Sequence, residues 1–211
     1  MFVGKRMKTD VITVSPSDTL HRAAALLREH RIHHLPVVDQ GNLVGIVTDT
    51  DIRNSRLEEA AMNGPGKAAW EAREVSEIMT RDVITLSPRD TIEDAALILH
   101  RKRFEAIPVV DRRKLAGIIA KADVIAAFLD TLRIEGVGVR VEVVLPRDLL
   151  SVQRLLRQFG EMETDVRSLV LSPRGKEFVA FVRISTIDVA TVKERLRAAG
   201  FKVPDVAEFL E

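Results

Sequence analysis

The chain has 211 residues, 46% of them hydrophobic, and its 32 basic and 31 acidic residues leave a net charge of +1. This composition predicts a globular chain of one long or two short domains, and the interspersed charges argue against nucleic acid as a partner. The absence of cysteine excludes disulfides, thiol catalysis and thiolate metal sites, and it suits a cytoplasmic location. No apolar run has the length of a signal region or a membrane span, so we expect no membrane association.

An internal repeat dominates the sequence up to residue 130. The stretch from Met7 to Pro16 recurs from Met79 to Pro88, and the match continues without a gap as far as Asp51 and Asp123. About half of the aligned positions are identical, which is far beyond chance for a window of this length. We call residues 1–55 the first copy and residues 75–130 the second copy.

Each copy is predicted to form a β-α-β-β-α unit. In the first copy a strand is predicted at Val11–Val14 and a helix at Leu20–Glu29. Two further strands follow at Leu35–Val38 and Leu43–Thr48, and a second helix comes after them. One such unit has too little sheet to bury its own apolar face. We therefore expect the two copies to pack together and to form a pseudo-twofold cleft between them.

A charged helical linker is predicted over residues 56–74. Its helical segments, Arg53–Met62 and Lys67–Glu74, are separated by Asn63-Gly64-Pro65-Gly66, which cannot continue a helix. Trp70, the only tryptophan, lies in this linker. We expect it to pack against a helix, and a contact with a partner protein is the alternative.

Residues 137–211 form a separate predicted domain of a different character. Its predicted elements, in order, are Val139–Leu145, Leu149–Phe159, Asp165–Leu171, Glu177–Ile184, Val189–Ala199 and the short extended piece Phe201-Lys202-Val203. The order β-α-β-β-α-β is the ferredoxin-like arrangement. The fold class predicted for the chain is therefore α+β.

The stretch from Leu43 to Asp51 is the candidate functional motif of the first copy. An apolar strand containing Gly45 ends at Thr48 and passes directly into a helix. Gly45 leaves room for another backbone or for a ligand to come close. Thr48 and Asp51 either cap the helix or bind a ligand, with the Asp51 carboxylate accepting hydrogen bonds from ribose hydroxyls. Both roles are compatible.

The doubled unit resembles a tandem pair of cystathionine-β-synthase (CBS) domains over residues 3–128. The resemblance is carried by the paired Asp-Val-Ile-Thr-x-Ser-Pro openings, the paired Pro-Val-Val-Asp strands, and the Gly-h-h-Thr-x-x-Asp signature at Gly45–Asp51, where h is apolar. Residues 137–211 resemble an ACT domain, and this domain order is similar to that of acetoin-utilisation proteins of the AcuB type. The resemblance implies a homodimer that binds AMP, ADP or ATP in the cleft, with S-adenosylmethionine or NAD as less favoured ligands.

The resemblance also implies the residues of two nucleotide sites. Site one comprises Ile12, Thr13, Val14, His33, His34, Pro36, Thr48 and Asp51. Site two, expected to be weaker, comprises Ile84, Thr85, Ile107, Pro108, Lys121 and Asp123. The second site has Ala120 in place of a threonine and so loses one polar contact, which Lys121 could partly offset by reaching a phosphate.

His33 and His34 are expected to donate hydrogen bonds to phosphate and to attract it more strongly when protonated. Glu105, which matches His33 in the second copy, would repel phosphate. The alternative is that one of the two histidines points into the core and the other into solvent. A metal site at His30, His33 and His34 is disfavoured because no carboxylate stands at a suitable spacing.

The C-terminal domain lacks one feature of the ACT family. The family usually carries a glycine in the loop after the first strand, and here the loop contains Leu149 and Leu150. A bulky side chain would obstruct an amino-acid ligand, which favours a dimerisation or partner surface.

The sequence contains no nucleophile paired with a base, no P-loop and no set of metal ligands, so we expect a non-enzymatic regulator acting on a protein partner. A dimeric adaptor that ignores nucleotides is the main alternative.

Overall fold

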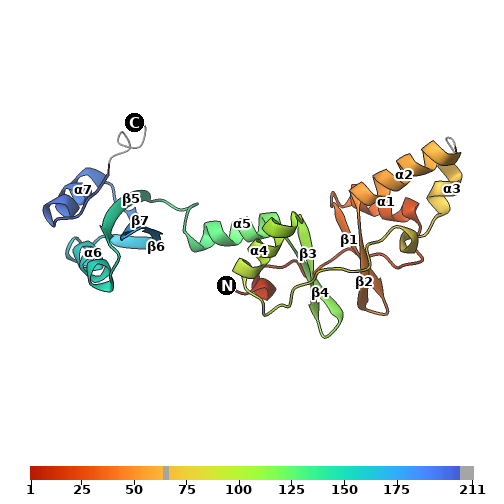
Figure 1. The fold of residues 1–211 in the computed structure, drawn as a ribbon, viewed down its shortest axis with the longest axis horizontal. Coiled ribbons are helices and arrows are strands. Elements are labelled where there is room, and N and C mark those ends of the chain that lie inside the picture. The colour runs from red at the N-terminus through yellow and green to blue at the C-terminus, as the bar shows by residue number, and fades with distance from the viewer. Residues whose placement is uncertain (64–66, 205–211) are drawn as a thin grey trace. The chain divides into compact units, whose positions relative to one another are not determined.

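The computed structural model describes residues 1–63 and 67–204. Contacts between residues divide the chain into an N-terminal unit, Met1–Ala127, and a C-terminal unit, Phe128–Glu211, and each is described by itself. Both units combine helices with a sheet (Figure 1), so the predicted α+β class is confirmed.

The N-terminal unit contains the two copies side by side (Figure 1). The first copy forms α1 (Leu20–Glu29), β1 (His34–Asp39), β2 (Asn42–Thr48) and α2 (Asp49–Asn63). The second forms α4 (Ile92–Lys102), β3 (Ala106–Asp111), β4 (Lys114–Ala120) and α5 (Lys121–Thr131). The predicted strand Val11–Val14 is reduced to one parallel bridge between Val14 and Val37, because only Val14 reaches the edge of β1.

One four-stranded sheet joins the copies, with the strand order β1-β2-β4-β3. Strands β2 and β4 meet antiparallel at Asn42 and Lys114, the first residues of the two strands. The same bulge recurs in both outer strands, between Val37 and Val38 and between Val109 and Val110. The sheet therefore has the pseudo-twofold symmetry that the repeat predicts.

The first residues of each copy pack on the other copy. The short 3-10 helix η1 (Val3–Lys5) inserts Val3 into the second copy's core, and the Val3 amide donates to the Asp90 carbonyl at 2.8 Å. Its counterpart η2 (Val75–Glu77) inserts Val75 into the first copy's core. Each core is therefore completed by residues from the other half of the repeat, a feature that the pattern of elements did not predict.

Gly45 and Gly117 are the points where these exchanged segments touch the sheet. A Cβ atom at Gly45 would lie 3.1 Å from the Thr80 carbonyl oxygen, and one at Gly117 would lie 2.7 Å from that of Lys8. The Ile46 amide donates to Thr80, and the Ile118 amide donates to Lys8, each at 2.9 Å. The space that the sequence predicted at Gly45 is therefore filled by another backbone.

The linker differs from its predicted boundaries. Helix α2 runs without a break from Asp49 to Asn63, because the apolar and charged residues after Ser55 continue the helix, and α3 covers Lys67–Ala72. Residues 64–66 of the predicted breaker lie outside the described part. Trp70 is buried in the first copy's core, and its Nε1 donates to Ser55 Oγ of α2 at 3.0 Å. The prediction that Trp70 packs against a helix is confirmed.

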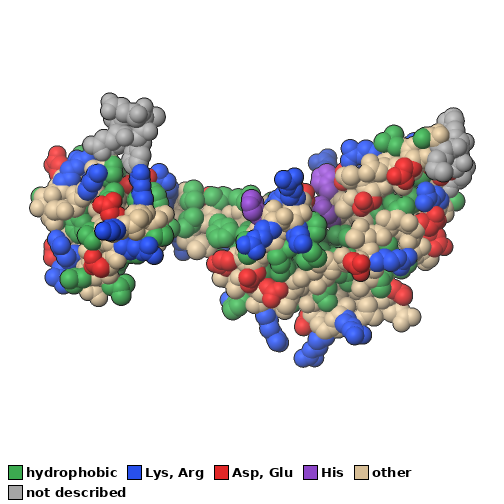
Figure 2. Space-filling model, viewed as in Figure 1, with side chains coloured by type: hydrophobic (Ala, Val, Ile, Leu, Met, Phe, Trp, Pro, Cys, Tyr) green, Lys and Arg blue, Asp and Glu red, His purple; other side chains and the backbone are tan. Residues whose placement is uncertain are grey.

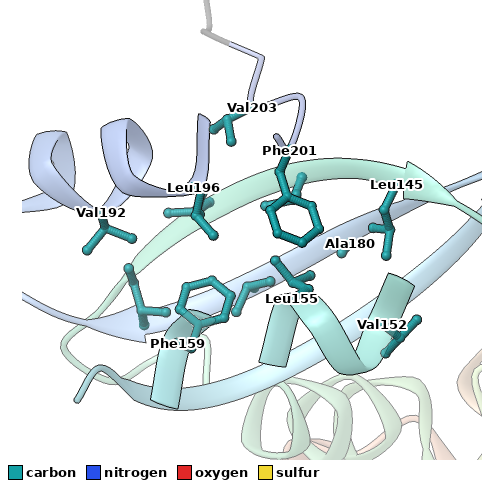
Figure 3. Packing of buried hydrophobic residues seen from close by; sticks show 13 residues of the cluster. Leu145, Val152, Leu155, Phe159, Ala180, Val192, Leu196, Phe201 and Val203 are labelled. Atoms are coloured by element: carbon teal, nitrogen blue, oxygen red, sulfur yellow. The ribbon is translucent and has the colours of Figure 1, made fainter. Parts of the chain in front are cut away.

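The C-terminal unit forms β5 (Val139–Pro146), α6 (Leu149–Glu161), β6 (Asp165–Arg174), β7 (Glu177–Ser185) and α7 (Val189–Ala198). The sheet order is β5-β7-β6. The last predicted extended piece is reduced to one antiparallel bridge between Lys202 and Val144. Figure 3 shows Leu155 and Phe159 of α6, Leu196 of α7, and Phe201 of the segment after α7 packed on the sheet. Residues 205–211 of the predicted domain lie outside the described part.

Candidate functional site

A cavity of about 320 Å³ lies between the two copies of the N-terminal unit. This volume is at the lower end of the range of small-molecule sites. The first copy contributes residues between Lys8 and Ile12 and residues at the start of β1, and the second copy contributes the start of β3, the end of β4 and the start of α5. The lining residues are Lys8, Asp10, Val11, Ile12, Arg31, Ile32, His33, His34, Glu105, Ala106, Ile118, Ala120, Lys121, Ala122 and Asp123.

Asp123 is the carboxylate at the junction between β4 and α5. Its Oδ2 accepts the Ala120 backbone amide at 2.9 Å, as an acidic residue in the first turn of a helix commonly does. Ala120 offers no hydroxyl that could compete for this carboxylate. The Asp123 oxygens therefore retain acceptor capacity for hydroxyl groups of a ligand in the cavity.

Thr48 and Asp51 form the corresponding junction of the first copy, and here they cap helix α2. Thr48 donates to Asp51 Oδ2 through both its backbone amide, at 2.9 Å, and its hydroxyl, at 2.7 Å. The Asp51 amide in turn donates to Thr48 Oγ1 at 3.2 Å. The capping role predicted for this pair is confirmed, and part of the acceptor capacity of Asp51 is already used.

The structure regroups the residues of the two predicted sites. Ile12, His33 and His34, predicted for the first site, line the same cavity as Lys121 and Asp123, which were predicted for the second. Neither Thr48 nor Asp51 is among the described residues that line it. The cavity combines residues of the two predicted sites because Lys8 pairs with Ile118, so the segment that continues to Ile12 lies against the second copy.

The other predicted site residues lie outside this cavity. Val14 is 3% exposed and Ile107 is 0% exposed in the hydrophobic cores, and Pro36 and Pro108 are buried beside them. Thr85 lines a different cavity of about 530 Å³ with Val83, Val110 and Arg113. Thr13 is half-buried and Ile84 is exposed, and neither lines the cavity at Asp123.

Lys8, Asp10 and Arg31 are lining residues that the sequence reasoning missed. A signal for them was present, because Lys8 and Asp10 belong to the repeated segment that precedes each predicted strand. This segment lines the cavity only because it crosses to the second copy and packs against it.

Charged residues of both signs surround the cavity. The Lys121 ammonium forms an ion pair with Glu105, so the repulsion of phosphate expected from Glu105 is neutralised and Lys121 is engaged. His33 Nδ1 lies 3.4 Å from Asp49 Oδ2, and Arg53 lies 3.2 Å from the same oxygen. Figure 2 shows histidine side chains at the surface of the N-terminal unit with Lys and Arg side chains nearby.

His34 is half-buried at the cavity wall rather than in a core, whereas the His33 side chain is 74% exposed. Burial lowers the pKa of His34, and the positive charge of His33 lowers it further. Asp49, Glu105 and Asp51 act in the opposite direction without reversing the shift. His34 is therefore neutral near pH 7 in this structure and can donate one hydrogen bond from the imidazole N–H.

Residues 3–58 and 75–130 each match the family model of the CBS domain. The chain belongs to the CBS domain family. A similar curated protein is the CBS domain-containing protein YhcV of Bacillus subtilis, with 36% identity over 56% of this chain and 78% of YhcV. The uncharacterized protein MJ1404 of Methanocaldococcus jannaschii is 28% identical over 87% of this chain, which spans 47% of that protein.

Solved structures similar to this chain contain CBS pairs with adenosine derivatives. CBSX2 in complex with AMP is 31% identical, with a TM-score of 0.54, over 61% of this chain and 96% of CBSX2. The CBS pair of MJ0100 was solved in complex with 5′-methylthioadenosine and S-adenosylmethionine. It is 32% identical to this chain, with a TM-score of 0.51, and the match covers 61% of this chain and 95% of the MJ0100 pair. A Vibrio cholerae protein described as an acetoin utilization protein (AcuB) shares the fold at 24% identity and a TM-score of 0.56, over 64% and 95% of the two chains.

Residues 1–63 and 67–204 contain no group of three His, Asp or Glu side chains placed to hold a metal ion. Among the helices of this described part, none has both the length and the apolar character required to cross a bilayer.

Proposed function

We propose that the N-terminal unit binds an adenosine-containing ligand in the cavity at Asp123. The observation that carries this proposal is the cavity itself, which is built from both copies around a carboxylate at a strand-to-helix junction. Ligands bind at such junctions in open α/β structures, where an acidic residue accepts hydrogen bonds from ribose hydroxyls. The AMP complex of CBSX2 supports this choice of ligand.

Each wall of the cavity has a chemical role in this proposal. Asp123 accepts hydrogen bonds from the ribose, and the apolar side chains of Ile12 and Ile118 contact the adenine ring. Lys8 and Arg31 line the same cavity, where their positive charge offsets that of the carboxylates that also line it. AMP, ADP and ATP are the leading ligands, and S-adenosylmethionine and NAD are the other adenosine derivatives to be compared.

Ligand binding would act as a regulatory signal rather than as a step of catalysis. Because the cavity is lined by both copies, a ligand that fits one arrangement of them better than another shifts the equilibrium between those arrangements. We propose that a homodimer carries this change to a protein partner, with the ACT-like C-terminal unit as the partner surface and without binding an amino acid.

A thermal-shift screen of the full chain tests this function. A ligand at 100 times its Kd should add about 2.7 kcal/mol to the stability of the domain that binds it. We expect AMP, ADP or ATP to raise the melting temperature of the wild-type protein, and Asp123→Ala to abolish the shift. A melting temperature that none of the five adenosine derivatives raises would contradict the proposal and favour the nucleotide-independent adaptor.

A further inference from the structure

The two junctions that follow β2 and β4 carry side chains of opposite charge at matched positions. In the second copy, the cationic Lys121 at the start of α5 pairs with the anionic Glu105. The repeat matches Lys121 with Asp49 and Glu105 with His33. In the first copy, therefore, the anionic Asp49 at the start of α2 pairs with the imidazole of His33, at 3.4 Å.

The backbone around the two junctions is nearly the same, so the reversal is a difference of side chains. The Lys121 amide donates to the Glu105 carbonyl at 2.9 Å, and the Asp49 amide donates to the His33 carbonyl at 3.2 Å. The segments that cross between the copies also match, because Lys8 bridges to Ile118 as Thr80 bridges to Ile46.

The balance of charge differs strongly between the two positions. The cavity at Asp123 is lined by three basic residues (Lys8, Arg31, Lys121) and three acidic ones (Asp10, Glu105, Asp123). The repeat matches these six residues with one basic residue, three acidic ones, a histidine and a threonine at the position around Asp51, namely Arg103, Asp49, Asp51, Asp82, His33 and Thr80. An excess of carboxylates disfavours an anionic ligand, since like charges repel strongly at short range.

We infer that Lys121 makes the cavity at Asp123 selective for phosphate-bearing adenosine ligands, an inference that rests on the proposed function. At the matching position of the first copy, Asp49 excludes phosphate from the surroundings of Asp51. Lys121 exchanges its ion pair with Glu105 for a charge-assisted hydrogen bond to the phosphate. Its side chain is 38% exposed, and that of Glu105 is 66% exposed, so both can reorient into solvent without leaving a buried charge. Each chain then binds one phosphorylated adenosine ligand.

This assignment reverses the expected ranking of the two sites. The hydroxyl of Thr48 was expected to strengthen the site at Asp51, but that hydroxyl donates to Asp51 itself. Lys121 was expected only to compensate for a weaker site at Asp123, but in this inference its positive charge selects the ligand.

Isothermal titration calorimetry of the full chain with AMP and with adenosine tests the inference. We expect one AMP per chain, bound at least about tenfold more tightly than adenosine, which is the contribution of one charge-assisted hydrogen bond. Lys121→Gln should remove this preference and leave adenosine affinity unchanged. Lys114→Gln, at the opposite end of β4, is the matched control and should retain it.

Asp49→Lys gives the reciprocal test. This substitution introduces the lysine of the second copy at the matching position of the first, and we expect it to create a second AMP site per chain. A preference for AMP that persists in Lys121→Gln, or two equal AMP sites in the wild-type protein, would overturn the inference. Failure of the proposed function is a distinct result, because then neither AMP nor adenosine would bind the wild-type protein.

Discussion

Gly117 provides the sharpest test of how the two copies are assembled. An alanine Cβ at this position would lie 2.7 Å from both the Lys8 carbonyl oxygen and Met7 Sδ. Lys8 is held there by two backbone hydrogen bonds to Ile118, each 2.9 Å long. Relieving the overlap moves the crossing segment away from β4 and lengthens both bonds.

The expected loss of stability follows from these contacts. Overpacking costs about 1–3 kcal/mol and each weakened hydrogen bond costs about 0.5–1.5 kcal/mol, so Gly117→Ala should destabilise the N-terminal unit by about 2–4 kcal/mol. Gly45→Ala should cost less, because the backbone oxygen of Thr80 lies 3.1 Å from its Cβ and the closest atom, Met79 Sδ at 2.7 Å, belongs to a flexible side chain.

Urea unfolding followed by tryptophan fluorescence measures this loss. Trp70 is the only tryptophan and lies in the first copy's core, so its signal reports the N-terminal unit. Gly45→Ala lies in the same unit and is the matched comparison, since its closest contact is with the end of a flexible side chain. A free energy of unfolding for Gly117→Ala within about 0.5 kcal/mol of wild type would refute the proposed role of the crossing segment.

Three further predictions concern the N-terminal unit. Thr48→Ala removes the cap of α2 and should lower the free energy of unfolding in urea by about 1 kcal/mol. The affinity for AMP should not change, and a large loss of affinity would place the ligand at Asp51 instead. Because the pKa of His34 is lowered in the folded state, the unfolded chain binds a proton more readily, so stability should fall as the pH drops below about 6.5. His34→Gln should flatten that decline, and an unchanged slope in urea titrations across this pH range would exclude His34 as its source. Trp70→Phe leaves the buried Ser55 hydroxyl without the donor whose hydrogen bond it accepts, and it should cost about 1 kcal/mol. Because this variant has no tryptophan, its urea unfolding is followed by far-UV circular dichroism, and an unchanged midpoint would show that the bond contributes nothing.

Much of the fold was predictable because its determinants are local. The helix at Leu20–Glu29 has the predicted bounds, and the strands around Val37 and Val47 differ from prediction by a residue or two at their ends. Repetition strengthened these predictions, since each element occurs twice. The strand predicted at Val11–Val14 failed because a run of β-branched residues does not reveal that only one residue finds a partner.

The site was less predictable because it depends on contacts between distant residues. Nothing in the local pattern shows that Lys8 lies against Ile118, so it does not show that Ile12 and Asp123 line one cavity. The ion pair between Glu105 and Lys121 likewise joins residues on separate elements. Several residues that the sequence analysis singled out, such as His34 and Asp123, line the cavity, but only the three-dimensional structure shows that they lie together.

The most direct test of the central claim compares the two aspartates that the repeat relates. Calorimetry of AMP binding to the full chain should show that Asp123→Ala abolishes binding, whereas Asp51→Ala retains the wild-type Kd and a stoichiometry of one. Retained affinity in Asp123→Ala together with lost affinity in Asp51→Ala would contradict the claim and place the ligand at the other junction.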